Sequence, residues 1–241
     1  MAVKPYSANS DSKKEQVEQM FDRIAFRYDL LNRVLSFGID KSWRKKALKK
    51  LKSLKPTSIL DVATGTGDVA ILEASTFPDA KITGLDLSRK MLDLAEKKVI
   101  QKNLNHRIHL IKGDSEALPF DDGMFDAVTV AFGVRNFENL ERGLKEMNRV
   151  LRPGGKTVIL EFSMPEKFPV RQLYYFYFKN ILPTLGGWLS GDSKAYSYLP
   201  DSVAAFPSGD NFLSILKNAG FKETKADKLM FGIASIYTGT K

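Results

Sequence analysis

Residues 59–70, ILDVATGTGDVA, form a pattern typical of a buried strand that runs into a glycine turn and then a helix. The run Ile59–Val62 is mostly apolar, as expected of a central parallel strand. Gly65 and Gly67 let the backbone approach a ligand closely. Nucleotides bind at this kind of strand-to-helix junction in open α/β sheets. The stretch therefore predicts an α/β fold with a nucleotide-type site.

Two further strands bring polar groups to the same edge of the predicted sheet. The segment 81–87, KITGLDL, ends near Asp86, and a carboxylate there can accept both hydroxyl protons of a ribose. The segment 108–114, IHLIKGD, is followed by Ser115 and carries Asp114 at its end. Three strands with polar groups at one edge indicate a ligand of the adenosine type.

Two classes of ligand fit this edge. Gly65–Ala70 satisfies the dinucleotide pattern G-x-G-x-x-G/A, and Asp86 follows at the spacing of a nicotinamide site. A pyrophosphate, however, needs a helix N-terminus without negative charge, and Asp68 stands there. Asp68 and Asp61 instead suit the ammonium group of a methionine-like tail, so S-adenosylmethionine is the expected cofactor. A tight turn without a ligand is the alternative. The candidate cofactor-binding residues are Asp61, Gly65, Thr66, Gly67, Asp68, Asp86, Leu87, Asp114, Ser115 and Ala131.

Composition restricts the possible classes of site. A chain of 241 residues with 43% hydrophobic residues can bury a large core as a single domain. Cysteine is absent, which excludes disulfides, thiolate ligands and a cysteine nucleophile. With only His106 and His109 available, no metal site is expected. The N-terminal residues lack a secretory pattern, and no window is apolar enough to span a bilayer, so we expect a cytoplasmic protein.

The net charge of +9 is concentrated near the N-terminus. Residues 1–56 hold 14 Lys or Arg against 6 Asp or Glu. The segment 41–55, KSWRKKALKKLKSLK, places Trp43, Leu48 and other apolar residues on one helical face and cations on the rest. Such a helix can pack on the domain, lie on anionic lipid or contact nucleic-acid phosphates.

The order of elements predicts a Rossmann-like, seven-stranded, mostly parallel sheet with helices on both faces. Parallel strands are expected near 57–63, 81–86, 108–113, 125–131 and 155–163, with a helix over 138–155 stopped by Pro153, Gly154 and Gly155. Two helices, 14–35 and 41–54, precede the sheet, and a helix (208–219) and an antiparallel hairpin near the C-terminus complete it. A single domain, 1–241, thus comprises a basic helical extension (1–56), a cofactor-binding core (57–163), an insert (164–207) and a C-terminal part (208–241).

The insert contains the most aromatic segment of the chain, 168–189. Its charged residues and prolines break it up too much for a membrane span. As a structural element it is a lid packed on the domain. As a functional element it forms the wall of an apolar pocket for a large hydrophobic acceptor.

Three motifs resemble one family. The first covers 28–43, YDLLNRVLSFGIDKSW, the second 132–136, FGVRN, and the third 149–163, RVLRPGGKTVILEFS. With the G-T-G-D loop and the A-L-P-F segment at 117–120, they resemble the ubiquinone/menaquinone biosynthesis C-methyltransferases, the UbiE/MenG family. The glycine loop alone would indicate only the superfamily of class I S-adenosylmethionine enzymes.

Two positions depart from the family pattern. Histidine usually follows the motif serine by four residues, and this chain has Asp40. That change casts doubt on a mechanism in which the histidine acts as acid or base. Asp40 either substitutes as a base or is structural, and we favour the structural role. Lysine usually precedes the Pro-Gly-Gly, and here Arg152 keeps the charge.

The resemblance implies methyl transfer from S-adenosylmethionine to a ring carbon of a polyprenyl quinol, with demethylmenaquinol as the first choice of acceptor and a ubiquinol precursor as the second. The acceptor must lose a hydroxyl proton, and a guanidinium stabilises the resulting oxyanion. Arg135 fits this role, Asn136 would orient the second ring oxygen, and Tyr28 or water would take the proton. The substrate also implies peripheral contact with the anionic inner face of the cytoplasmic membrane.

Other classes fit less well. A nucleic-acid methyltransferase would use the basic face, but the chain lacks an N-P-P-Y type motif and a cysteine. A noncatalytic binding module leaves the edge carboxylates and the Arg135–Asn136 pair unexplained. We therefore expect no nucleic-acid partner. The oligomeric state stays open, a homodimer being one alternative.

Overall fold

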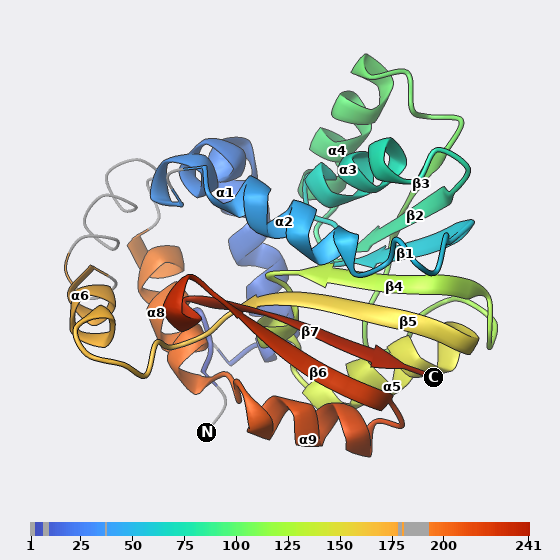
Figure 1. The fold of residues 1–241 in the computed structure, drawn as a ribbon. Helices are drawn as coiled ribbons and strands as arrows, with labels where there is room; N and C mark the ends of the chain where they lie inside the picture. Colours follow the sequence, from blue (N-terminus) through green and yellow to red (C-terminus); the bar gives the residue numbers. More distant parts are fainter. Residues whose placement is uncertain (1–2, 7–9, 37, 178–179, 181–192) are drawn as a thin grey trace.

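The computed structural model describes residues 3–6, 10–36, 38–177, 180 and 193–241. Five neighbouring strands of one sheet are parallel: β1 (Ser58–Val62), β2 (Lys81–Asp86), β3 (Ile108–Lys112), β4 (Phe125–Ala131) and β5 (Leu151–Phe162). The sheet has seven strands in the order β3-β2-β1-β4-β5-β7-β6. The predicted fold class is confirmed (Figure 1).

β1 and β4 are mostly apolar because both of their faces are covered. Leu60, Ala127 and Val128 are completely buried. β1 lies between β2 and β4 in the sheet, so its C-terminal turn opens beside the ends of both neighbours. The strand order also reverses at this strand, which is where ligands bind in doubly wound sheets.

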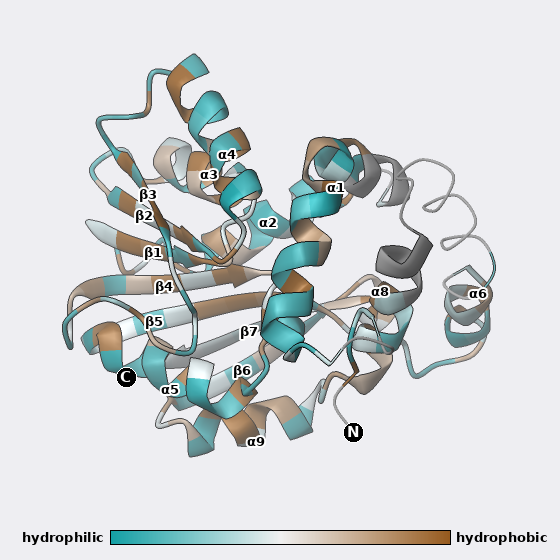
Figure 2. Cartoon of the chain, turned by 180° about the vertical axis from the view of Figure 1, so that it is seen from behind, coloured by the Kyte–Doolittle hydropathy of each residue, from teal (hydrophilic) through white to brown (hydrophobic). Residues whose placement is uncertain are grey.

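The C-terminal hairpin was predicted correctly. β6 (Lys222–Leu229) and β7 (Ala234–Thr240) are antiparallel, and β7 inserts between β5 and β6. β7 is almost wholly buried, whereas the edge strand β6 carries lysines that discourage pairing with another chain. In Figure 2 β6 is mostly hydrophilic, unlike the mostly hydrophobic central strand β4.

Two helical layers cover the sheet. α2 (Asp40–Lys49), α3 (Asp68–Thr76) and α4 (Arg89–Gln101) lie on one side, and α5 (Leu140–Val150) and α9 (Asp210–Asn218) on the other (Figure 1). The helix expected over 138–155 is in fact shorter, because β5 begins at Leu151. Arg152 precedes a proline and is therefore biased toward the extended conformation. Gly154 (φ 76°) and Gly155, which were expected to follow the end of the helix, therefore lie within β5.

The apolar face of α2 is used for packing. Trp43, Ala47 and Leu48 are buried in a core cluster that includes Ala70 of α3 and Leu160 of β5. This placement supports the packed-helix interpretation of 41–55. Its lysines remain on the outer side, where Lys41, Lys45, Lys46 and Lys49 are exposed.

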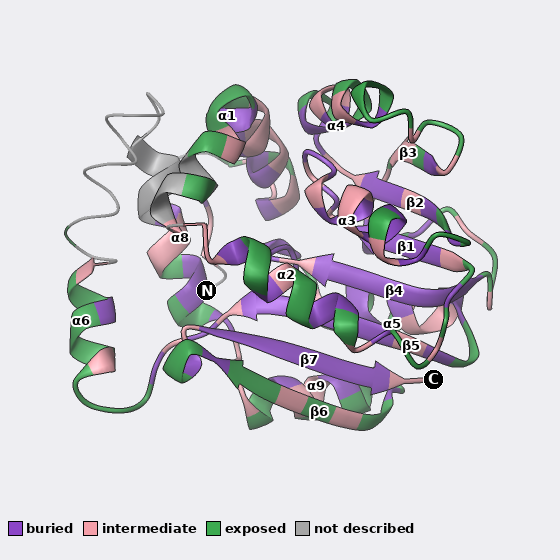
Figure 3. Ribbon diagram, turned by 45° about the horizontal axis from the view of Figure 1, so that its top comes forward, coloured by how far each residue is buried: buried purple, intermediate pink, exposed green. Residues whose placement is uncertain are grey.

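Helices from the extension and the insert gather at the carboxyl ends of β4 and β5. These are α1 (Lys13–Leu35), α6 (Val170–Phe176) and α8 (Ser193–Ala205), as Figure 3 shows. Short 3₁₀ turns, η1 (Val134–Asn136) and η3 (Met230–Gly232), connect to the same end. A third core cluster joins the helices through Ile24, Tyr174 and Tyr198. Part of the predicted aromatic segment, 181–189, lies outside the described residues. In the described part of the chain, no helix is both long and apolar enough to cross a membrane.

Candidate functional site

A pocket lies at the carboxyl edge of the sheet, between α1 and the turns that follow β1, β2, β3 and β4. The space between these elements, open solvent at the mouth included, is about 710 Å³. Several of the residues predicted from the sequence line it: Tyr28, Gly65, Asp86, Leu87, Asp114, Ser115, Ala131 and Asn136.

The glycine loop has the conformation that its sequence requires. Gly65 (φ 56°) and Gly67 (φ 77°) both adopt the left-handed region that favours glycine. A Cβ on Gly65 would meet nothing within 4 Å, so its open side is free for a ligand. A Cβ on Gly67 would lie 3.0 Å from the Cβ of Ala95, so this glycine permits close packing of α3 against α4.

Asp86 is held rigidly at the pocket wall. Its Oδ2 accepts a hydrogen bond from the Gly65 amide (2.8 Å) and its Oδ1 accepts one from the Ser88 amide (2.9 Å). Burial raises the pKa of this carboxyl to about 6, although these amide bonds act to lower it. Each carboxylate oxygen has a second lone pair. The ionised group can therefore still accept hydrogen bonds from two neighbouring hydroxyls of a ribose.

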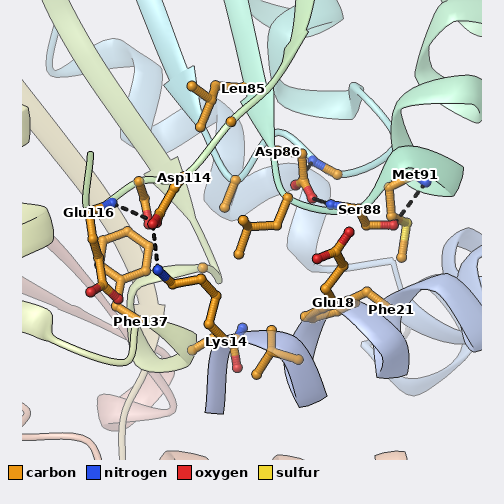
Figure 4. Close-up of a pocket in the computed structure, with 18 of the residues that line it drawn as sticks. Lys14, Glu18, Phe21, Leu85, Asp86, Ser88, Met91, Asp114, Glu116 and Phe137 are labelled. Carbon is orange, nitrogen blue, oxygen red and sulfur yellow. Dashed lines mark hydrogen bonds and ion pairs between the residues drawn. The ribbon is translucent and has the colours of Figure 1, made fainter. Parts of the chain in front are cut away.

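Helix α1 closes the opposite side of the pocket with polar contacts along its length (Figure 4). Lys14 Nζ donates to Asp114 Oδ2 at 2.6 Å. Farther along, Lys112 Nζ pairs with Glu18 (2.7 Å), and Ser88 Oγ donates to Asp22 (2.5 Å). α1 is thus attached to the ends of β2 and β3, whose residues are the candidates for holding the cofactor.

Of the pocket residues on α1, only Tyr28 was predicted from the sequence. Lys14, Val17, Glu18 and Phe21 all line the pocket. The helix itself was predicted over 14–35, and an amphipathic face was expected in 41–55 and 138–155 but not in this helix. Val17, Phe21 and Ile24 recur at helical spacing, a signal that could have indicated a second face directed at the sheet.

Four predicted cofactor residues lie off the pocket wall: Asp61, Thr66, Gly67 and Asp68. Asp68 pairs with Arg44 (3.0 Å) and Lys98 (2.7 Å). Burial would raise the pKa of Asp68, but these two cations hold it below its usual value. An ammonium group would have to compete with both cations. Contact between these residues and the cofactor stays a prediction.

Asp61 belongs to a buried carboxyl cluster beneath the glycine loop. Thr64 Oγ1 donates to Asp61 Oδ2 (2.6 Å), and Thr129 Oγ1 donates to Glu73 Oε1 (2.6 Å) and approaches Asp61 Oδ1 (3.2 Å). Burial raises the pKa of Asp61 to about 7 and that of Glu73 well above its ordinary value. The cluster lies beneath the loop and supports it, and contact between Asp61 and the cofactor stays a prediction.

Of the three candidate catalytic residues, Tyr28 and Asn136 face the pocket and Arg135 does not. The side chain of Arg135 is only 8% exposed and forms a buried ion pair with Glu161 (2.7 Å). Its Nη1 also donates to the Phe132 carbonyl, and its guanidinium lies over the Phe162 ring, 5.6 Å from the centroid. Glu161 was not singled out from the sequence, where it appeared only within the third motif.

Asp40 has structural partners. It is 8% exposed, accepts a hydrogen bond from Ser36 Oγ (2.9 Å) and pairs with Arg44 (3.3 Å), which in turn contacts Asp68. This arrangement ties the junction of α1 and α2 to the start of α3. It supports the structural interpretation of the Asp40 position. The described residues contain no group of three acidic or histidine side chains that could hold a metal ion.

Comparisons with known proteins agree with the fold and the motifs. The chain is 48% identical over 239 residues to a demethylmenaquinone methyltransferase of Bacteroides fragilis, with 99% of this chain and 97% of the relative covered. It is 51% identical over 230 residues to a ubiquinone/menaquinone biosynthesis C-methyltransferase, UbiE, of Geotalea daltonii, with 95% and 97% covered. These identities confirm the family resemblance.

Solved structures support the fold alone. A methyltransferase of Thermotoga maritima, described as S-adenosylmethionine-dependent and a possible histamine N-methyltransferase, superimposes with a TM-score of 0.67 at 18% identity, covering 93% of this chain and 99% of that chain. A putative S-adenosylmethionine-dependent methyltransferase of Methanococcus maripaludis gives 0.63 at 22% identity, covering 92% and 94%. The sequence pattern of one family matches residues 9–241. On this match and these identities, the chain belongs to the ubiE/COQ5 methyltransferase family.

Proposed function

We propose that this protein transfers the methyl group of S-adenosylmethionine to a ring carbon of a polyprenyl quinol, with demethylmenaquinol as the acceptor. The observation that carries the proposal is Asp86, which is fixed by the Gly65 and Ser88 amides and faces the pocket at the strand end. The name of the Bacteroides fragilis relative supports the choice of acceptor.

The residues of the pocket fit this cofactor. Asp86 can accept the ribose hydroxyls, Gly65 leaves open space beside it, and Asp114 and Ser115 lie at the end of the adjacent strand. When bound, S-adenosylmethionine supplies an electrophilic methyl group. The protein must then hold the acceptor carbon in line with this methyl group and keep water out, and alignment of this kind can contribute several kcal/mol.

The acceptor becomes nucleophilic at carbon when an adjacent ring hydroxyl ionises. Free phenols ionise near pH 10. Arg135 in η1 supplies a guanidinium that can form charge-assisted hydrogen bonds to an oxyanion. Asn136, on the pocket side of the same turn, would orient the second ring oxygen. Tyr28 on α1 or a water molecule would carry the hydroxyl proton away. After the methyl group has moved from sulfur to the ring carbon, the hydrogen of that carbon would pass to the ring oxygen and restore the aromatic quinol.

A ubiquinol precursor is the second candidate acceptor. The Geotalea daltonii relative, at 51% identity, carries a name that includes both quinone types. To prefer one of the two acceptors, the pocket would have to distinguish a naphthalene ring from a benzene ring.

A polyprenyl quinol resides in a bilayer, so the enzyme also needs contact with a membrane surface. The exposed lysines of α2 provide cations, while the apolar face of that helix is already buried in the core. The contact we propose is therefore electrostatic, without insertion of α2. Each cation near an anionic surface contributes about 1 kcal/mol.

The test uses purified protein, S-adenosylmethionine and a short-chain demethylmenaquinol kept reduced with dithionite. Mass spectrometry should detect a C-methylated product that forms only with the reduced acceptor, because the oxidised quinone has no hydroxyl to ionise. A matched reaction with a short-chain ubiquinol precursor ranks the two acceptors. Calorimetry with NAD in place of S-adenosylmethionine should show no binding. Failure of both acceptors to be methylated would contradict the proposal.

A further inference from the structure

Three buried polar atoms around η1 have no hydrogen-bond partner among the described residues: Arg135 Nε, Asn136 Oδ1 and the hydroxyl of Tyr198. Tyr198 is 4% exposed and Asn136 is 9% exposed. Leaving a buried donor or acceptor unpaired destabilises the folded state. Several such atoms in one region therefore need a physical explanation, and a ligand that pairs with them is one.

The three residues come from two parts of the chain that meet at the carboxyl edge of the sheet. Arg135 and Asn136 are neighbours in η1, and α8, which carries Tyr198, packs against η1. Tyr198 belongs to the same apolar cluster as Met91, which lines the cofactor pocket. Burial raises the pKa of Tyr198 to about 12, and the charges of Arg135 and Glu161 act on it as well. Tyr198 therefore stays protonated and can donate.

The three atoms differ in whether they donate or accept hydrogen bonds, and this difference matches the two ring oxygens of a quinol. Arg135 Nε–H can only donate, Asn136 Oδ1 can only accept, and the Tyr198 hydroxyl can donate. A quinol that has lost one proton presents an oxyanion, which only accepts, and a remaining hydroxyl, which can donate. The donors match the oxyanion and the acceptor matches the hydroxyl.

We propose that Arg135, Asn136 and Tyr198 form the subsite for the two ring oxygens of a dihydroxylated aromatic acceptor, with Tyr198 as the group that the insert contributes. This assignment rests on the proposed function. With this assignment the insert supplies a hydrogen-bond donor to the acceptor, in addition to its expected role as the wall of an apolar pocket. The assignment also explains why the Arg135 side chain keeps one N–H outside its ion pair with Glu161.

The decisive variant is Tyr198→Phe, which removes only the hydroxyl. If the hydroxyl serves the fold alone, deleting an unpartnered group should leave the melting temperature equal or higher and activity unchanged. If it binds the oxyanion, kcat/KM for the short-chain demethylmenaquinol should fall about 10-fold, while the dissociation constant of S-adenosylmethionine stays the same. The acid limb of the kcat profile should also move about one pH unit upward, because a weaker donor leaves the bound acceptor less acidic.

The matched control is Tyr175→Phe, whose ring is 55% exposed on α6 and which should retain wild-type values. Tyr198→Phe with kcat/KM within twofold of wild type and an unmoved pH profile would overturn the assignment of Tyr198. That outcome differs from a failure of the proposed function, because in the latter case the wild-type protein itself would not methylate the quinol.

Discussion

Lys14 Nζ lies 2.6 Å from Asp114 Oδ2, so that a residue from the first turn of α1 reaches across the pocket to the strand-end carboxylate predicted to hold the cofactor. Asp114 also accepts a hydrogen bond from the Glu116 amide through its other oxygen. A ligand that contacts this carboxylate must share it with Lys14 or displace it.

Replacement of Lys14 should therefore ease cofactor binding. Both partners are partly exposed, so the ion pair is worth about 0.2–1 kcal/mol, and Lys14→Gln should tighten S-adenosylmethionine binding by roughly two- to fivefold. The change should shrink as salt rises, because salt screens the wild-type pair. Calorimetry at two ionic strengths measures both effects.

A matched control for Lys14 is Lys228→Gln, which breaks the exposed pair with Glu166 and should leave cofactor affinity unchanged. Weaker binding in Lys14→Gln than in wild type would mean that the lysine contacts the cofactor directly and does not compete with it.

Asp86 should make cofactor binding depend on pH. In the proposed site its carboxylate form accepts the ribose hydroxyls, and burial raises its pKa to about 6. Affinity for S-adenosylmethionine should thus fall as pH drops below 6 and level off above 7. Asp86→Asn should remove this step and weaken binding by roughly 10- to 100-fold, since hydrogen bonds to a charged group contribute about 1.5–3 kcal/mol.

Loss of folding through protonation of Asp86 cannot explain this fall in cofactor affinity at low pH. A carboxyl whose pKa is raised in the folded state favours folding at low pH and loses that contribution as pH rises through about 6. Binding and the contribution of Asp86 to stability should therefore change in opposite directions between pH 5 and 7. If Asp86→Asn kept the pH step, the titrating group would have to be sought elsewhere, with Asp61 first.

The proposed membrane contact can be tested by removing positive charges from α2. Replacing Lys41, Lys45, Lys46 and Lys49 by Gln should reduce sedimentation with phosphatidylserine-containing vesicles, while the melting temperature should stay near wild type because these side chains are exposed. Four other exposed lysines, Lys90, Lys97, Lys102 and Lys145, give a control with the same loss of net charge. Equal sedimentation of the two variants would show that α2 has no special part in attachment.

The sheet and its ligand edge could be predicted because their signals are local. An apolar run followed by glycines, as in 59–70, needs no knowledge of other segments, and strand ends of one parallel sheet meet at one edge. The boundary between α5 and β5 was wrong by several residues because the strand begins before the proline and glycines that were assumed to stop the helix.

Side-chain partners were harder to predict, since they depend on segments far apart in the chain. Asp68 was expected to face an ammonium group, but Arg44 and Lys98 reach it from α2 and α4. Arg135 was expected at the open edge, yet Glu161 pairs with it from the end of β5. Sequence patterns place residues at the edge of the sheet, but they do not indicate which charged side chain from a distant segment will lie beside them.

The Arg135–Glu161 pair makes the usual alanine test of Arg135 ambiguous. Glu161 is completely buried; burial raises its pKa, and Arg135 lowers it. Arg135→Ala would leave this carboxyl without its partner, at a cost of about 3–5 kcal/mol in the free energy of unfolding. Lost turnover could then reflect lost folding.

The double variant Arg135→Met/Glu161→Met separates the two effects. Replacing both members of a buried pair by apolar residues of similar volume is often neutral or stabilising, so its melting temperature should return toward wild type. If the guanidinium stabilises the developing oxyanion of the acceptor, turnover should nevertheless stay roughly 100-fold or more below wild type, the loss typical of removing one oxyanion-stabilising donor.

Affinity of the double variant for S-adenosylmethionine should barely change, because neither side chain lines the cofactor pocket. Arg135→Lys should rescue turnover only in part, since it keeps the charge and loses the planar fork. A double variant that folds and methylates quinol at a near-normal rate would reduce Arg135 to a structural residue and leave Tyr28 and Asn136 as the groups to test.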